Sequence, residues 1–147
     1  MNIFEALRES HERQREILAQ LVNTSGDTKE RASLFKAITQ ELEAHERAEE
    51  RHFYRPLMMD DNGVDPSRHG IAEHHEIDEI LEQLNDTDPS SPAWLSHAKQ
   101  LQHKVLHHLD EEEHKFFQMA GKILSQEEKE KLTKPYLKDY EQALTQH

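Results

Sequence analysis

Two segments of the sequence place a glutamate four residues after a histidine and follow the pair with aromatic residues. The first, "HERAEERHFY", begins at His45 and includes Glu49, and the second, "HLDEEEHKFF", begins at His108 and includes Glu112. Residues four apart on a helix lie on one face, with Cβ atoms about 5–6 Å apart. Each pair can therefore direct an imidazole nitrogen and a carboxylate towards one point, as a metal ion requires.

Both segments belong to an internal repeat with an offset of 63 residues. The same offset relates His11 to His74, and it relates apolar positions to apolar positions, such as Leu18 to Leu81 and Ile38 to Leu101. We interpret the repeat as two helical hairpins. Each hairpin carries one histidine on its first helix and a His-x-x-x-Glu pair on its second.

The helical phase predicts which of these side chains face the interior. Each His-x-x-x-Glu pair continues an apolar stripe, and His11 is in phase with Leu7 and Leu18. His74 is in phase with apolar residues, whereas His75 is in phase with acidic ones. The predicted inward-facing set is His11, His45, Glu49, His74, His108 and Glu112. The histidines predicted to lie on the surface are His52, His69, His97, His103, His107, His114 and His147.

A buried set of four imidazoles and two carboxylates needs a compensating positive charge, because an unpaired buried charge costs at least several kcal/mol. A divalent metal ion supplies that charge. Nitrogen and oxygen ligands without sulfur suit iron, manganese or zinc. Two carboxylates that are able to bridge favour a pair of ions over a single ion.

Two alternative metal sites compete with this interpretation. A ferritin-like di-iron oxidase would use Glu-x-x-His, which occurs at Glu49 with His52 and at Glu111 with His114. These pairs are offset by 62 residues, so they cannot both share the phase of the apolar stripe. The other alternative is a structural zinc site in an acidic helical interaction module. Six ligands argue against it, because structural zinc usually closes its sphere with four.

The elements that position these residues are amphipathic helices separated by turn-forming segments at 23–28, 59–67 and 85–92. Ser125 and Glu128 form a possible capping box for a further helix, which Pro135 would interrupt. We predict an all-α protein: an up-down-up-down four-helix bundle over residues 1–121 and a short C-terminal helical tail over 122–147. The four predicted helices span about 2–22, 29–58, 67–85 and 92–120.

Composition narrows the expected partners and location. The formal net charge of -12 opposes a nucleic-acid partner, and the 147-residue chain has no cysteine for a disulfide or a thiolate metal site. No long apolar run predicts a membrane segment or a signal peptide. We therefore expect a cytoplasmic protein, monomeric or homodimeric, with neither nucleic acid nor membrane as partner.

The order of ligands, His, then His-x-x-x-Glu, and then both again, resembles the hemerythrin-like family of HHE cation-binding domains over residues 4–120. The resemblance implies two iron ions bridged by Glu49, Glu112 and an oxo or hydroxo group. It also implies a small ligand, namely O2, peroxide or NO, which the protein would sense, scavenge or use in iron handling. By the same resemblance, the histidine pair that would bind one iron is His11 and His45, and the other is His74 and His108.

The sequence departs from the oxygen carriers of that family. Those proteins have a fifth histidine on the third helix, where this chain has Asp78, and a different last carboxylate, where this chain has Glu113 beside the better-phased Glu112. These differences argue against reversible oxygen carriage. Asp78 and Glu46 are candidate extra ligands, because each lies next to or one turn from a predicted histidine ligand. The iron-centre repair proteins of the family have a histidine that this chain lacks between His11 and His45.

Overall fold

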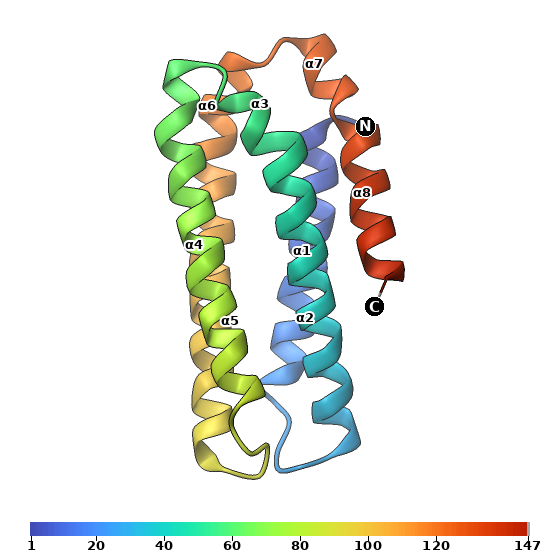
Figure 1. Ribbon diagram of the computed structural model, residues 1–147, viewed down its shortest axis with the longest axis vertical. Helices are drawn as coiled ribbons and strands as arrows, with labels where there is room; N and C mark the ends of the chain where they lie inside the picture. The colour runs from blue at the N-terminus through green and yellow to red at the C-terminus, as the bar shows by residue number, and fades with distance from the viewer. Residues whose placement is uncertain (147) are drawn as a thin grey trace.

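The computed structural model describes residues 1–146, which form an all-helical bundle (Figure 1). Four long helical segments run up and down side by side, which confirms the predicted architecture. None of the described helices is long and apolar enough to cross a membrane. The segments are α1 (Ile3–Leu21); α2 (Lys29–Glu49) with η1 (Glu50–Tyr54) and α3 (Arg55–Leu57); α4 (Asp61–Asn85); and α5 (Pro92–Glu111) with η2 (Glu112–Phe116) and α6 (Phe117–Ile123).

Helix α4 begins earlier than predicted, so the expected loop at 59–67 is wrong beyond residue 60. The Asp60 side chain accepts a hydrogen bond from the backbone N–H of Asn62 at 2.9 Å and caps the helix. Gly63 packs directly against the backbone of Leu57, where any Cβ would clash. Capping and close packing therefore start the helix despite Pro66 inside it, and turn-type composition alone is misleading here.

Both His-x-x-x-Glu segments run into a single π-helical turn. In η1 the backbone N–H of Arg55 donates to the carbonyl of Glu50, and in η2 that of Phe117 donates to the carbonyl of Glu112. These are i to i−5 bonds, which widen the helix by one residue and often occur at functional sites. The turns begin immediately after Glu49 and at Glu112, so both wide turns lie next to the predicted ligands.

The C-terminal tail consists of α7 (Gln126–Lys131) and α8 (Thr133–Thr145), as the capping box and the proline predicted. The hydroxyl of Ser125 accepts a hydrogen bond from the N–H of Glu128 at 3.1 Å. The helix breaks at Leu132, because Pro135 lacks the N–H that a continuous helix needs. Helix α7 crosses one end of the bundle, and α8 then runs back along α2 (Figure 1).

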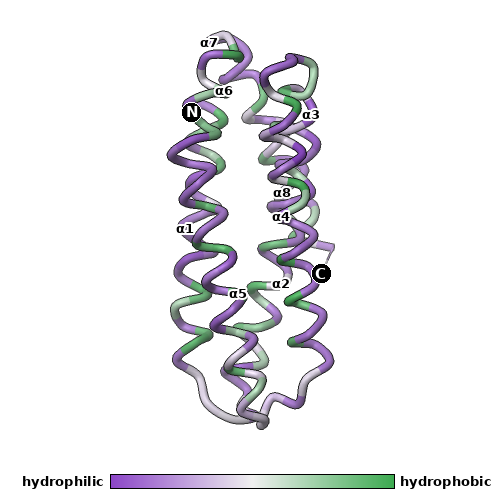
Figure 2. The backbone as a smooth tube through the Cα atoms, turned by 90° about the vertical axis from the view of Figure 1, so that its left-hand side faces the viewer, coloured by the Kyte–Doolittle hydropathy of each residue, from purple (hydrophilic) through white to green (hydrophobic). Residues whose placement is uncertain are grey.

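Two apolar clusters form the core, and the predicted ligands lie between them. On α1, Leu7 belongs to one cluster and Leu18 to the other, and His11 lies between them in sequence. On α2, Ala48 and Leu42 are divided in the same way around His45. Short hydrophobic stretches accordingly alternate with hydrophilic ones along the long helices (Figure 2). The bundle therefore has a polar layer inside an apolar core.

Candidate metal centre

The structure brings all six predicted ligands together in the interior. Each is at most 4% exposed. Their candidate ligand atoms form two groups, and within each group the atoms lie within 4.8 Å of one another. The first group is His11, His45, Glu49 and Glu112, and the second is Glu49, His74 and His108. Glu49 therefore belongs to both groups.

The two glutamates lie between the two histidine pairs. Glu49 Oε1 is 3.4 Å from His45 Nε2 and 3.2 Å from His74 Nε2, so one carboxylate reaches a histidine of each pair. Glu112 does the same with its two oxygens: Oε1 is 3.2 Å from His11 Nε2, and Oε2 is 3.6 Å from His108 Nε2. Both carboxylates therefore occupy bridging positions between the pairs.

The inward-facing atoms of this set have no hydrogen-bond partners among the described residues. They are the Nε2 atoms of all four histidines, both carboxylate oxygens of Glu49, and Oε1 of Glu112. Buried polar atoms are normally hydrogen-bonded, because an unsatisfied buried group costs about 1–3 kcal/mol. A donor set of nitrogen and oxygen atoms that is buried, convergent and unpartnered fits a metal centre.

The outer nitrogen of each histidine, in contrast, has a partner. Three of these partners are carboxylates and one is a phenol. Such hydrogen bonds fix the ring orientation and leave the Nε2 lone pair free for a metal ion. The Nδ1 atoms of His11, His74, His108 and His45 lie 2.7 Å from Glu113 Oε2, 2.7 Å from Glu50 Oε2, 2.8 Å from Glu73 Oε1 and 3.1 Å from the Tyr136 hydroxyl, respectively.

The internal repeat relates two of these four partners to each other, whereas Glu73 has no carboxylate at its equivalent position and Tyr136 comes from the C-terminal tail. Glu50 and Glu113 are related by the 63-residue offset. The equivalent of Glu73 is Ser10, whose hydroxyl donates to Glu41 Oε1 at 2.8 Å instead. Tyr136 on α8 takes the place of the missing carboxylate. Sequence reasoning missed Tyr136, because nothing in its spacing connects it to the repeat.

Helix α8 is held in position by polar contacts with the bundle. The Tyr140 hydroxyl donates to Glu41 Oε1 at 2.6 Å and accepts from Arg13 Nε at 3.0 Å. Asp139 Oδ2 lies 3.1 Å from His52 Nε2. Asp139 and Tyr140 both lie about one turn after Tyr136 on α8, so these contacts fix the helix that carries Tyr136.

Mutual electrostatics hold protons in this layer when no cation is bound. Burial lowers the pKa of His11, but the Glu112 and Glu113 carboxylates more than reverse this and raise it to about 9. Burial and the neighbouring Glu49 raise the pKa of Glu112 to about 7. Burial opposes ionisation of Glu113, but His11 and Arg15 lower its pKa to about 2. A cation bound in this layer would displace the protons that His11 and Glu112 hold.

Tyr54 closes one side of the layer. Its hydroxyl donates a short hydrogen bond to Glu112 Oε2. Its ring stacks between the His74 ring, at 5.5 Å and 22°, and the Phe116 ring, at 5.3 Å and 12° between planes. Gly70 faces this ring, and a Cβ there would lie 2.5 Å from the Tyr54 oxygen. The glycine is therefore needed for Tyr54 to reach Glu112.

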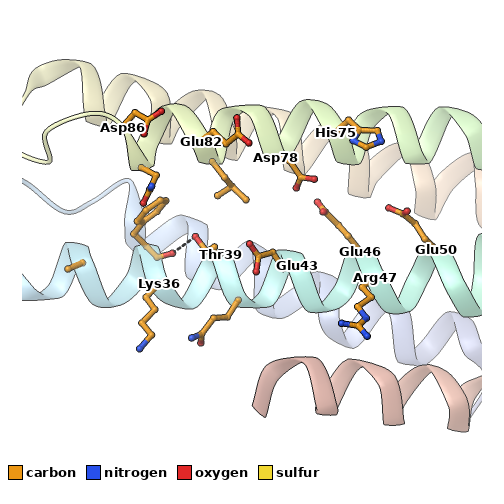
Figure 3. Close-up of a pocket in the computed structure, with 15 residues that line it drawn as sticks. Lys36, Thr39, Glu43, Glu46, Arg47, Glu50, His75, Asp78, Glu82 and Asp86 are labelled. Carbon is orange, nitrogen blue, oxygen red and sulfur yellow. Dashed lines mark hydrogen bonds between the residues drawn. The ribbon is translucent and has the colours of Figure 1, made fainter. Parts of the chain in front are cut away.

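The two candidate extra ligands, Glu46 and Asp78, lie outside both groups. They line a groove between α2 and α4, where acidic side chains of the two helices face one another (Figure 3). Glu46 is buried with Oε1 unpartnered, and burial raises its pKa well above the ordinary value. Asp78 is half-buried. A coordinating role for either residue stays a prediction from the sequence.

The remaining histidines lie outside the two groups. His75 is exposed, and so are four histidines of the predicted surface set, namely His69, His103, His107 and His114, whereas His52 and His97 are half-buried and His147 lies outside the described residues. The ferritin-like pairs are not assembled at one centre. His52 contacts Asp139, and His114 Nδ1 lies 3.2 Å from Asp110 Oδ1.

Comparisons with known proteins agree with this geometry. The family described as "Hemerythrin HHE cation binding domain" matches residues 2–120. The fold superimposes with a TM-score of 0.90 on the crystal structure of a hemerythrin HHE cation-binding domain-containing protein from Mycobacterium kansasii, at 23% identity, covering 99% of this chain and 89% of that one. A curated protein named DNA nickase, from Nostoc sp., is 29% identical over 130 residues. The match covers 88% of this chain but 36% of the Nostoc protein.

Proposed function

Because the chain belongs to the hemerythrin HHE cation-binding family, we propose that it is a non-heme di-iron protein that binds or reduces a small oxidant: O2, peroxide or NO. The observation that supports this function is the convergence of unpartnered Nε2 and carboxylate atoms inside the bundle. Water is largely excluded from this layer, so the atoms need cations to compensate their desolvation.

The proposed ligand assignment follows the two groups. One ion would be held by His11 and His45, and the other by His74 and His108. Glu49 would be able to bridge the two, since it belongs to both groups and neither of its oxygens has a hydrogen-bond partner among the described residues. Glu112 would be the second bridging residue, since its two oxygens face His11 and His108, and an oxo or hydroxo group would complete the set.

Iron ions in such a site would supply the redox chemistry for binding or reducing the oxidant. Residues around the site would control hydrogen bonding to its ligands and the access of water. Tyr54 keeps its proton, because burial and the Glu112 carboxylate raise its pKa well above the ordinary value, so it remains a donor to Glu112. Phe53 and Phe116 pack together with ring centroids 5.4 Å apart and exclude water from one side of the layer.

A cavity of about 320 Å³ provides a path for a small ligand. His108 and Glu112 line it together with apolar side chains such as Phe116 and Met119. Because this cavity reaches His108, we propose that the oxidant approaches the centre from the side of His74 and His108.

The test uses the reduced, iron-loaded protein. When O2, peroxide or NO is added to protein that has been kept free of oxygen, the visible absorption of the iron pair should change. Repeated additions of peroxide should then distinguish two versions of the function. A reducing enzyme consumes many peroxide molecules per centre, whereas a binding protein consumes at most about one. Absence of any spectral response to all three oxidants in the iron-loaded protein would overturn the proposal.

One alternative has specific support. The first group, with two histidines and two glutamates, has the ligand number of a closed tetrahedral zinc site. Such a site would make the protein a structural module, and it would leave His74 and His108 without a role, since Glu49 already belongs to the first group. Metal analysis distinguishes the two functions.

We propose no nucleic-acid partner. The name of the Nostoc relative concerns DNA, but that protein is much longer than the matched region. The formal net charge of -12 of this chain opposes approach to a phosphate backbone. Whether the protein is a monomer or a homodimer stays a prediction from the sequence.

A further inference from the structure

A second cluster of metal-ligating side chains lies outside the buried centre, on the wall of the cavity that reaches it. His69 and Glu73 lie one turn apart on α4, and Glu111 faces them from the end of α5. His69 Nε2 is 2.9 Å from Glu111 Oε1 and 3.4 Å from Glu73 Oε1. One ligand atom of each residue lies within 4.8 Å of the others. The spacing is comparable to that of the buried groups.

The cluster combines exposure to solvent with contact to the interior. The His69 side chain is 57% exposed and that of Glu111 is 29% exposed, whereas that of Glu73 is only 6% exposed. Glu73 Oε1 also accepts the hydrogen bond from His108 Nδ1 at 2.8 Å. All three residues line the same cavity as His108 and Glu112. An ion held here would be solvated on one side and one residue away from the buried centre on the other.

Ordinary surface ion pairing explains this cluster less well than cation binding. The Glu73 and Glu111 carboxylates converge on one imidazole, that of His69, and one positive charge on this ring could not balance both of them. One imidazole and two carboxylates are a common ligand set for Fe²⁺, Mn²⁺ and Zn²⁺. Such a site completes its coordination with water where it faces solvent.

We propose that His69, Glu73 and Glu111 form a third, solvent-accessible divalent-cation site, through which ferrous ions pass to the buried pair. The transit role rests on the proposed di-iron function, whereas cation binding at the cluster does not. Passage requires a ligand set that binds the ion reversibly and a path inward. The cluster supplies three ligands, and the cavity supplies the path to His108.

The groove between α2 and α4 is the competing path (Figure 3). It is also acidic, and Glu50 connects it to His74 through the hydrogen bond to Nδ1. However, its side chains form no group of three convergent ligand atoms among the described residues. The exposed Glu82 on this groove therefore offers a matched control. Glu82→Gln removes one negative charge, as Glu111→Gln does, but it removes it from the α2–α4 groove and not from the cavity that Glu111 lines.

The experiment measures ion stoichiometry and loading rate in the full-length metal-free protein. Calorimetric titration with Zn²⁺ should give three ions for the wild type and for Glu82→Gln, but two for Glu111→Gln. Stopped-flow mixing with Fe²⁺ in air should show about tenfold slower formation of the iron-pair absorption in Glu111→Gln only. Circular dichroism establishes that both variants are folded.

Three results would count against the proposal. The same number of Zn²⁺ ions in the wild type and in Glu111→Gln would overturn the third site. Equal Fe²⁺ loading rates in wild type and Glu111→Gln would overturn its transit role, and slow loading in Glu82→Gln alone would assign the path to the α2–α4 groove. Failure of the di-iron function is distinguishable, because the wild type would then form no iron-pair absorption at all.

Discussion

Tyr136→Phe tests whether the C-terminal tail takes part in metal binding. The change removes one oxygen atom, which lies 3.1 Å from His45 Nδ1, in a region where His45 is 2% and Tyr136 0% exposed. Water cannot reach this position, so leaving His45 Nδ1 without a hydrogen-bond partner should lower the free energy of unfolding by about 1–3 kcal/mol. Each 1.4 kcal/mol corresponds to a factor of ten, and loss of a hydrogen bond to a metal-ligating histidine typically costs about 10–100-fold in affinity. We therefore expect Tyr136→Phe to bind the metal about 10–100-fold more weakly than the wild type.

The matched control is Tyr140→Phe, one turn further along α8. Tyr140 stacks on Tyr136 with ring centroids 6.0 Å apart, but its hydroxyl contacts Glu41, which is not a predicted ligand. Urea unfolding of the metal-free proteins should show a similar loss of stability in both variants. Competition with a chromophoric Fe²⁺ chelator should show weaker binding in Tyr136→Phe only. Equal affinity in wild type and both variants would refute a positioning role for Tyr136.

Three further predictions concern the buried layer. His45→Ala should lose metal and destabilise the protein, because the native state loses a stabilising ligand, whereas His103→Ala on the exposed side of α5 should leave metal content and melting temperature unchanged. Gly70→Ala should lower the unfolding free energy by about 1–3 kcal/mol by overpacking against Tyr54, measured by urea titration; an unchanged value would mean that Tyr54 moves freely. The pKa of His11 is raised to about 9 from 6.5, so the stabilisation from its extra proton is present below pH 6.5 and lost towards pH 9. Since metal must displace that proton, the melting temperature of the metal-free protein should fall from pH 7 to 9, and the rise in melting temperature on adding metal should grow over the same range. A rise that becomes smaller towards pH 9 would contradict this.

Periodicity was sufficient to predict which side chains enter the interior. The 3.6-residue phase separates His74 from His75, and the structure buries the first and exposes the second. The repeat offset excluded a centre built on His52 and His114, and neither approaches the buried groups. These predictions hold because burial of an apolar stripe fixes the rotation of a helix whatever its exact ends.

Contacts that depend on tertiary structure could not be predicted in this way. The partner of His45 comes from α8, 91 residues along the chain, and no periodicity relates the two. Glu50 and Glu113 follow their ligands directly, but their role depends on the π-helical turns that begin there. The start of α4 depends on the close approach of Gly63 to Leu57, which composition does not reveal.

Metal content tests the central claim most directly. The full-length protein, purified without added metal and dialysed to remove weakly held ions, should contain two iron ions per chain by elemental analysis. Glu49→Gln should reduce that content, because Glu49 belongs to both groups. A di-iron centre would be contradicted by one zinc ion per chain and no iron, if His74→Ala and His108→Ala both left the zinc content unchanged.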